Sequence, residues 1–282
     1  MKRILVIAAL VSTSLVAFSQ DRFADVEVTS QSVSGSVYML TGAGGNIGVS
    51  AGDDGLLIID DQYAPLADKI AAELKSISDM KTKYVVNTHY HGDHTGSNAF
   101  FHENQGATIF AHENVRIRLA SAEDADQQSL PVITYKDGIK FHINGDTAHV
   151  FHLPSAHTDG DSAIWFEKAN VLHTGDIFFN GMFPYVDLGA GGDVEGYIEA
   201  IKVLLAKIDP TTKIIPGHGK LANKQDLMRF VDMIEQTHQY VQAQKAKGMS
   251  EAEVVEAGLE EKWKSWAWQF INEERWIKTL YQ

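Results

Sequence analysis

The stretch THYHGDHTG, residues 88–96, holds three histidines and one aspartate within six positions. It follows the apolar run YVV at 84–86, which is short enough to be a buried strand. Imidazole nitrogens and carboxylate oxygens bind borderline divalent ions such as zinc readily, and a loop at a strand end can turn several toward one point. Gly92 and Gly96 permit the tight turn that this needs. A lone histidine would more often be a surface or core residue, but this density predicts a metal site.

Three further candidate ligands stand in loops after later apolar runs. His157 lies in PSAHTDGDS after TAHVFHL, Asp176 lies in HTGD after NVLH, and His218 lies in PGHG after KII. Glycine or proline flanks each of them, so these loops and 88–96 can converge on one edge of the predicted sheets. Each residue taken singly is compatible with an ordinary polar loop position. The set as a whole favours one shared site.

HYHGDH fits an H-x-H-x-D-H signature, and with the later His, Asp and His in order the chain resembles the metallo-β-lactamase superfamily over nearly all of its mature length. The resemblance implies an α/β fold, a four-layer αβ/βα sandwich with two metal ions at the edge between its sheets. It also implies a ligand set: His89, His91 and His157 on the first ion, Asp93, His94 and His218 on the second, and Asp176 bridging both.

The implied ligand set is chemically reasonable on its own terms. Seven ligands are too many for one tetrahedral zinc, but they suit two Zn²⁺ ions per chain that share a carboxylate and a water. Such a pair lowers the pKa of the shared water toward neutrality, which supplies hydroxide for hydrolysis. Asp93 is then the expected catalytic residue, because it can orient that hydroxide and receive its proton. A His/Asp set also accepts iron or manganese.

Composition narrows the functional classes. The 24 lysines and arginines against 37 acidic residues give a net charge of −13, which disfavours nucleic acid and stable membrane association as partners. A small-molecule substrate is expected instead, and the oligomeric state is left open. The chain has no cysteine, which excludes disulfides, thiolate metal ligands and a cysteine nucleophile.

Residues 1–19, MKRILVIAALVSTSLVAFS, have a basic start, an apolar stretch and small residues before the expected cleavage point. This layout predicts a signal peptide and a periplasmic or secreted protein, with residues 20–282 forming the hydrolase domain. The alternative is an uncleaved membrane anchor, which the short and interrupted apolar run disfavours.

The remaining pattern predicts strands with interleaved helices in two similar halves, near 20–135 and 136–282. Helices are expected near 65–77, 96–104, 113–120, 194–208, 223–247 and 250–260. The glycine-rich segment TGAGGNIG at 41–48 is expected to be a mobile hairpin tip, and the resemblance to zinc β-lactamases implies that it lies over the substrate. The tryptophan-rich tail, 263–276, is expected to pack on the core, with a substrate or partner surface as the alternative.

The substrate is less well defined by the sequence. The resembled family includes hydrolases of β-lactams, lactones, thioesters, sulfate esters and phosphodiesters; export disfavours glutathione thioesters and intracellular nucleic acids. A β-lactamase lysine clamp is absent because Phe179 occupies its place, and Lys136 or Lys220 could replace it. Four residues, Asn180, Met182, Phe183 and Tyr185, are expected to form a largely apolar substrate wall, and the alternative is that they only cover the core.

Other residues near the candidate ligands are expected to have supporting roles. Thr158 and Ser162 are expected to orient ligand imidazoles, while His142, His149, His152 and His173 are expected to be structural. Two alternatives to a hydrolase stay open: a di-iron redox protein, although the chain lacks the glutamate and flavin domain typical of that class, and a non-catalytic metal-binding module.

Overall fold

Two β-sheets form the centre of the computed structural model, which describes residues 22–282. The predicted signal peptide lies outside the described residues. The first sheet comprises β1 (Thr29–Ser34), β2 (Val37–Thr41), β3 (Ile47–Ser50), β4 (Leu56–Ile59), β5 (Thr82–Val86), β6 (Thr108–His112) and β7 (Ile133–Tyr135), in that spatial order. The second comprises β8 (Gly138–Ile143), β9 (Asp146–His152), β10 (Ser162–Phe166), β11 (Val171–His173), β12 (Lys213–Ile215) and β13 (Ala222–Asn223), in the order β13-β12-β11-β10-β9-β8.

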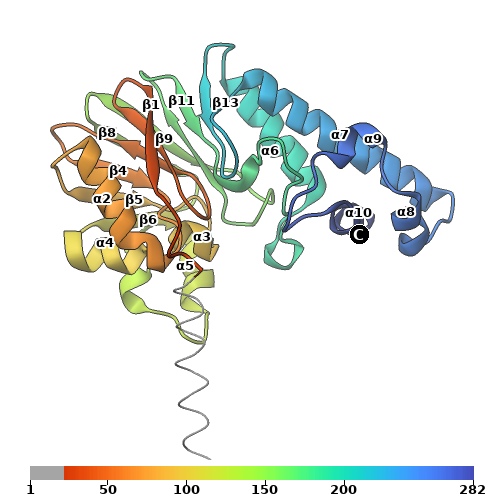
Figure 1. Cartoon of the computed structure of the whole chain (residues 1–282), viewed down its shortest axis with the longest axis horizontal. Helices are drawn as coiled ribbons and strands as arrows, with labels where there is room; N and C mark the ends of the chain where they lie inside the picture. Colours follow the sequence, from red (N-terminus) through yellow and green to blue (C-terminus); the bar gives the residue numbers. More distant parts are fainter. Residues whose placement is uncertain (1–21) are drawn as a thin grey trace, which may run out of the picture.

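Helices cover the outer faces of both sheets (Figure 1). The α-helices are α2 (Ala67–Ile77), α3 (Gly92–Thr95), α4 (Asn98–Gln105), α5 (Glu113–Ala120), α6 (Val194–Lys207), α7 (Lys224–Ala246), α8 (Glu251–Ala257), α9 (Glu261–Lys264) and α10 (Glu273–Tyr281). The short 3-10 turns are η1 (Ala64–Leu66), η2 (Gln127–Ser129), η3 (Gly175–Ile177) and η4 (Leu188–Ala190). In the part of the chain that the structure describes, no helix combines the length and apolar character needed to cross a membrane.

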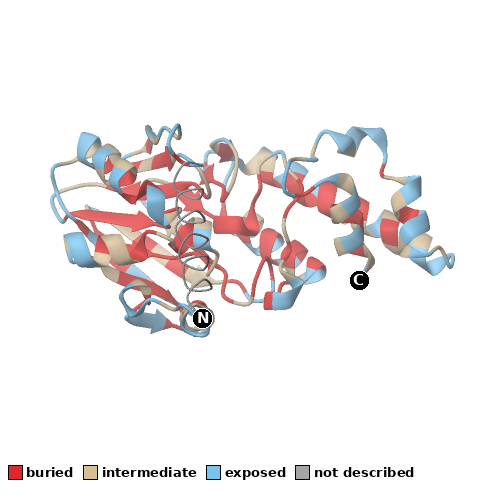
Figure 2. Ribbon diagram, turned by 60° about the horizontal axis from the view of Figure 1, so that its bottom comes forward, coloured by how far each residue is buried: buried red, intermediate tan, exposed pale blue. Residues whose placement is uncertain are grey.

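Three apolar clusters hold the layers together. Ile59 and Val86 of the first sheet face Val150 and Ile164 of the second in the cluster between the sheets. A second cluster joins the first sheet to α2 and α4, and a third joins the second sheet to α6, α7, α8 and α10. Figure 2 shows these buried residues concentrated in the sheets and on the inward helix faces. The result is the predicted α/β/β/α order, since each layer buries its apolar face on the next.

The topology brings several chain crossings to one edge of the sandwich. In the first sheet, β4, β5, β6 and β7 run parallel, while β11 and β12 are the parallel pair of the second sheet. Loops that leave β5, β9, β11 and β12 therefore carry the candidate ligands to a common edge, because the carboxyl ends of parallel strands lie side by side.

The C-terminal helices extend from the second sheet as an arm (Figure 1). A capping box between Asn223 and Asp226 starts α7, whose length places its second half beyond the sheet. Trp276 of α10 is fully buried, and its indole N–H donates to Thr237 of α7 at 3.1 Å. The segment before α10 returns to the sandwich, where Phe183 N donates to Trp266 O at 2.8 Å. The arm is thus connected to the edge that carries the ligands.

Candidate metal centre

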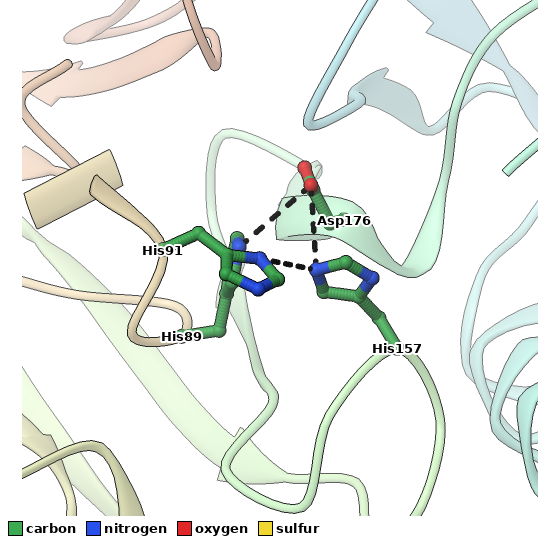
Figure 3. A group of neighbouring side chains, drawn as sticks. All are labelled: His89, His91, His157 and Asp176. Atoms are coloured by element: carbon green, nitrogen blue, oxygen red, sulfur yellow. Dashed lines mark hydrogen bonds and ion pairs between the residues drawn. The ribbon is translucent and has the colours of Figure 1, made fainter. Parts of the chain in front are cut away.

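All seven candidate ligands meet at the edge between the sheets, in two adjoining groups. His89, His91, His157 and Asp176 form the first group, with one nitrogen or oxygen from each lying within 4.8 Å of the others (Figure 3). Asp93, His94 and His218 form the second group on the same criterion. The loop after β5 supplies His89 and His91, the short helix α3 supplies Asp93 and His94, and η3 supplies Asp176.

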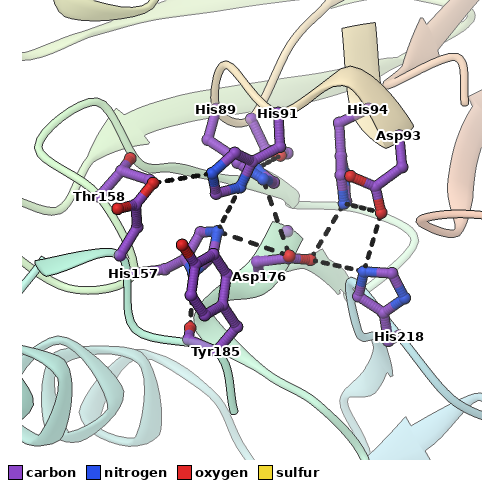
Figure 4. Close-up of polar contacts among 12 residues, drawn as sticks. His89, His91, Asp93, His94, His157, Thr158, Asp176, Tyr185 and His218 are labelled. Atoms are coloured by element: carbon purple, nitrogen blue, oxygen red, sulfur yellow. Dashed lines mark hydrogen bonds and ion pairs between the residues drawn. The ribbon is translucent and has the colours of Figure 1, made fainter. Parts of the chain in front are cut away.

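Asp176 stands between the two groups with one carboxylate oxygen toward each (Figure 4). Its Oδ2 lies 3.5 Å from His157 Nε2 and 3.7 Å from His89 Nε2. Its Oδ1 lies 3.1 Å from His94 Nε2 and 3.4 Å from His218 Nε2. Gly217 permits this approach, because a Cβ there would overlap Asp176 Oδ1. A carboxylate in this position can bridge two cations.

Several of the facing atoms are buried without a hydrogen-bond partner. These atoms are His89 Nε2, His94 Nε2 and Asp176 Oδ1. The 3.1 Å contact between His94 Nε2 and Asp176 Oδ1 is close but does not have hydrogen-bond geometry. Leaving a buried polar atom unpaired costs about 1–3 kcal/mol, so three together indicate that something else is meant to satisfy them. Imidazole nitrogens and a carboxylate around one point match the donor set of zinc, and the residues therefore fit a divalent ion.

Burial and the neighbouring carboxylates split the histidine pKa values in opposite directions. Burial lowers the pKa of His157 to about 4 and that of His89 well below its usual range. Burial also opposes protonation of His218, but the adjacent Asp176 and Asp93 outweigh it and raise the pKa of His218 to about 9. His89 and His157 therefore present neutral imidazoles, which is the form that binds metal. The second group is held together in the absence of metal by ion pairs with the two carboxylates.

Hydrogen bonds on the far side of two imidazoles fix which nitrogen faces the centre. His94 Nδ1 donates to the buried Asp60 Oδ2 at 2.7 Å. Thr88 Oγ1 donates to the same Asp60 oxygen at 2.8 Å, so it accepts from His89 Nδ1 at 3.0 Å. Because Nδ1 of each ring is engaged in these bonds, Nε2 is the nitrogen aimed at the site in both rings. Asp60 and Thr88 were not singled out from the sequence, where they read only as polar residues after strands.

The segment Tyr185–Asp187 orients the other two histidines of the first group. His157 Nδ1 donates to Tyr185 O at 2.6 Å, and Asp187 N donates back to His157 O at 2.9 Å. His91 Nε2 donates to Asp187 Oδ2 at 3.0 Å, and Tyr90 OH donates to that oxygen at 2.6 Å. His91 Nδ1 and His157 Nε2 then face each other at 2.9 Å. A carboxylate behind a ligating imidazole fixes its tautomer and raises its basicity.

The glycine-rich segment 41–48 is held in place by the ligand loops, contrary to the expectation of a mobile tip. Gly45 N donates to Asp93 O at 3.1 Å, and Asn46 N donates to Gly217 O at 2.7 Å. A Cβ on Gly45 would overlap the His94 ring, and one on Gly44 would lie 2.9 Å from Asp93 Cβ. Glycine occurs here because the backbone must lie against the ligands. The segment therefore lies directly against the ligands of the second group.

A cavity of about 820 Å³ opens over the two groups. Of the expected substrate wall, Tyr185 lines it, whereas Asn180, Met182 and Phe183 do not. Phe183 is fully buried and stacks on Trp276 in the core, so the prediction that it contacts substrate is wrong. The side chain of Asn180 donates instead to Lys220 O at 2.9 Å.

The cavity also contains residues that sequence patterns did not assign to it. Phe179, Trp268 and Phe270 are in its lining, and so are Phe23, Tyr63 and Arg22. The tryptophan-rich tail therefore serves both expectations: Trp276 belongs to the core, while Trp268 and Phe270 reach the cavity. Neither lysine considered as a clamp lines it. Lys136 is exposed beside Glu113, and Lys220 is exposed elsewhere.

The supporting roles assigned from the sequence also need correction. Thr158 donates to Asp161, and Ser162 accepts from Tyr135 OH at 3.1 Å, so neither contacts a ligand imidazole. The expectation for His173 agrees with its place: it is buried, and its Nε2 donates to Asn46 O at 3.1 Å. His152 stacks on His112 with ring centres 3.8 Å apart, away from the cavity.

The fold and this site define a class of protein with two metal-ligand groups on the edge of a four-layer sandwich. Residues 40–218 match the model of the metallo-beta-lactamase superfamily, and the chain belongs to this superfamily. The predicted αβ/βα fold is thereby confirmed. A hydroxyacylglutathione hydrolase of Methylococcus capsulatus is 32% identical over 138 residues, which are 48% of this chain and 47% of that protein. Metallo-beta-lactamase IND-1 of Chryseobacterium indologenes is 31% identical over 159 residues, 56% of this chain and 63% of that protein.

Two solved structures with the same fold cover different shares of this chain. The metallo-beta-lactamase from Pontibacter korlensis superposes with a TM-score of 0.63 at 18% identity and covers 74% of this chain and 99% of its own. A double mutant of the sec-alkyl sulfatase PisA1 reaches 0.72 at 16% identity and covers 90% of this chain and 50% of its own. The chain spans about half the length of the first curated relative and of the sulfatase. At these identities the structures show the fold alone.

Proposed function

We propose that this protein is an exported hydrolase that binds two zinc ions and cleaves a carbonyl-centred bond. The observation that carries the proposal is the position of Asp176, with one oxygen toward each ligand group. The partnerless His89 and His94 nitrogens support it. So do the curated relatives, whose names are those of hydrolases. Two bound ions would supply an activated water and polarise the substrate carbonyl.

Within this site His89, His91, His157 and Asp176 would hold one ion, and Asp93, His94, His218 and Asp176 the other. Asp93 has a second role, because it lines the cavity while its Oδ2 lies 3.4 Å from His218 Nε2. The ion pairs with His94 and His218 outweigh burial and lower the pKa of Asp93, which keeps it ionised. An ionised carboxylate at the cavity floor can accept a proton and pass it to the leaving group.

The metal ligands do not define which class of bond is cleaved, but the residues that line the cavity limit how a substrate can be held. The amide of a β-lactam is one candidate, supported by the relationship to the Chryseobacterium enzyme. A lactone, thioester, aryl ester or sulfate ester is the alternative. No lysine lines the cavity among residues 22–282, so a β-lactam carboxylate would need another cationic contact.

A hydrolysis screen of the zinc-loaded mature protein tests the proposal. The panel should contain a chromogenic cephalosporin, a lactone, a thioester, an aryl ester and an alkyl sulfate. Turnover of a carbonyl substrate that is lost in Asp93→Ala is the expected result, with the metal content of the variant measured on the same sample. Asp124→Asn, in an exposed loop, is the matched control and should keep full activity. Full activity in Asp93→Ala would exclude the mechanism.

Metal analysis and the mature N-terminus complete the test. Elemental analysis should find zinc, whereas iron together with oxygen reduction would favour the di-iron alternative. Metal uptake without turnover of any panel member would favour a binding module. Export is tested by the intact mass of the protein from the periplasm or medium, which should correspond to a chain that begins near residue 20.

A further inference from the structure

The cavity above the ligand groups is lined by two sets of neighbouring aromatic side chains, which are called its two walls below. The first wall comprises Phe179, Tyr185, Trp268 and Phe270, and the second comprises Phe23 and Tyr63. On the first wall, Phe270 lies 5.4 Å from Tyr185 and 5.7 Å from Trp268 between ring centres. On the second, the rings of Phe23 and Tyr63 are 5.1 Å apart. A volume of 820 Å³ is within the range of sites that enclose drug-sized ligands, roughly 300–1,000 Å³.

The first wall is held in place by hydrogen bonds of Trp268 and by contacts of Arg275. Trp268 Nε1 donates to Phe183 O at 2.9 Å, and Trp268 N donates to Ile271 O at 3.0 Å. Arg275 stacks on Phe270 at 4.2 Å and donates to its carbonyl oxygen at 3.0 Å. These bonds aim the indole at the ligand edge, where its ring centre is 6.2 Å from that of His218. The wall is therefore built in advance of any ligand.

The second wall depends on a single lysine of α2. Lys69 Nζ donates to the carbonyl oxygens of Phe23, Ala24 and Val26 at 3.0, 2.7 and 2.7 Å. One ammonium thus satisfies three carbonyls of the N-terminal segment and holds it against Tyr63. Arg22 belongs to this segment, with its guanidinium carbon 4.4 Å from the ring centre of Phe23 and 5.2 Å from that of Tyr63.

Among residues 22–282, Arg22 is the one arginine or lysine in the lining of this cavity. It forms no ion pair with any carboxylate of residues 22–282. The protein as a whole carries a charge of −13, so an anionic ligand is not attracted by the overall field and needs a local cation. A guanidinium that is stacked on two rings keeps its N–H groups available for a carboxylate, sulfonate or sulfate.

We infer that the substrate is amphiphilic, with a flat apolar group that lies between the aromatic walls and an anionic group that Arg22 binds at the cavity rim. This inference rests on the proposed function, since it places the cleaved carbonyl at the ligand groups between the walls. In this arrangement Trp268 and Phe270 contact the apolar group of the substrate. Arg22 binds its anionic group, and Lys69 positions Arg22.

Two fluorescent probes that differ by one anionic group test the inference without any turnover. Anilinonaphthalene sulfonate carries the anion, and phenylnaphthylamine is its neutral counterpart. Wild-type protein should bind both and prefer the sulfonate. Arg22→Ala should lower the affinity for the sulfonate by about three- to fivefold, as expected for an exposed ion pair. Its affinity for the neutral probe should not change. Trp268→Ala should lower the affinity for both probes by about tenfold.

Lys69→Met provides an independent variant, because it keeps the aliphatic stem and removes the ammonium. It should reproduce the loss of sulfonate preference seen in Arg22→Ala, whereas Lys75→Met on the exposed face of the same helix should behave as wild type. Equal affinity of Arg22→Ala and wild type for the sulfonate would overturn the assignment of the anion. Unchanged binding of both probes by Trp268→Ala would overturn the aromatic subsite. Either result leaves the hydrolysis screen as a separate test of the proposed function.

Discussion

Asp187→Asn should weaken binding of the first metal ion without changing the shape of the site. Asp187 Oδ2 accepts from His91 Nε2 at 3.0 Å, and the two side chains are only 13% and 19% exposed. The amide oxygen can still accept this bond but carries no charge, and it no longer favours the His91 tautomer that points Nδ1 at the site. Removing such an outer partner typically costs about 10–100-fold in metal affinity, which corresponds to about 1.4–2.7 kcal/mol.

Competition with a zinc chelator, followed through both binding steps, measures this effect. One step should weaken by the stated factor in Asp187→Asn, and the other should stay close to wild type. Tyr90→Phe is the matched control because it removes the 2.6 Å bond to the same oxygen while His91 keeps its acceptor. Its affinity should stay within about fivefold of wild type. Two wild-type binding steps in Asp187→Asn would refute the argument that this carboxylate orients His91.

Two further predictions concern packing and pH. Gly45→Ala should weaken binding of the second metal ion and lower the free energy of unfolding by about 1–3 kcal/mol, because its Cβ overlaps the His94 ring. Gly92→Ala is the control: no heavy atom lies within 4 Å of its new Cβ, so thermal unfolding and metal titration should match wild type. Burial lowers the pKa of both His112 and His152. The unfolded chain therefore binds these protons more readily, and the stability that depends on the neutral forms is lost as pH falls below about 6.5. The Tm advantage of wild type over His152→Gln should shrink from pH 7.5 to 5.5, and a constant difference would contradict this.

The sequence was most informative where the chemistry is local. The motif at 88–96 and the loops with His157, Asp176 and His218 could be found because each ligand follows an apolar strand within a few residues. Parallel strand order then brings those loops to one edge. The alternation of strands and helices predicted the layers, because each element buries its apolar face on the next layer.

The walls of the cavity could not be predicted in this way. Phe23 and Trp268 are separated by most of the chain, and only the tertiary fold places both in the same cavity. Phe183 is apolar and close in sequence to Asp176, yet it faces the core because Trp276 of the arm packs against it. The glycines of 41–48 indicated flexibility when taken alone. Their reason, close approach to His94 and Asp93, becomes visible only when the ligand loops are in place.

The central claim is that Asp176 joins two metal ions, and anomalous diffraction from zinc-loaded crystals tests it most directly. We predict two anomalous peaks on either side of the Asp176 carboxylate, one among His89, His91 and His157 and one among Asp93, His94 and His218. In crystals of Asp176→Ala at least one peak should be lost. A single peak in the wild-type protein, or ions bound away from these residues, would contradict the account.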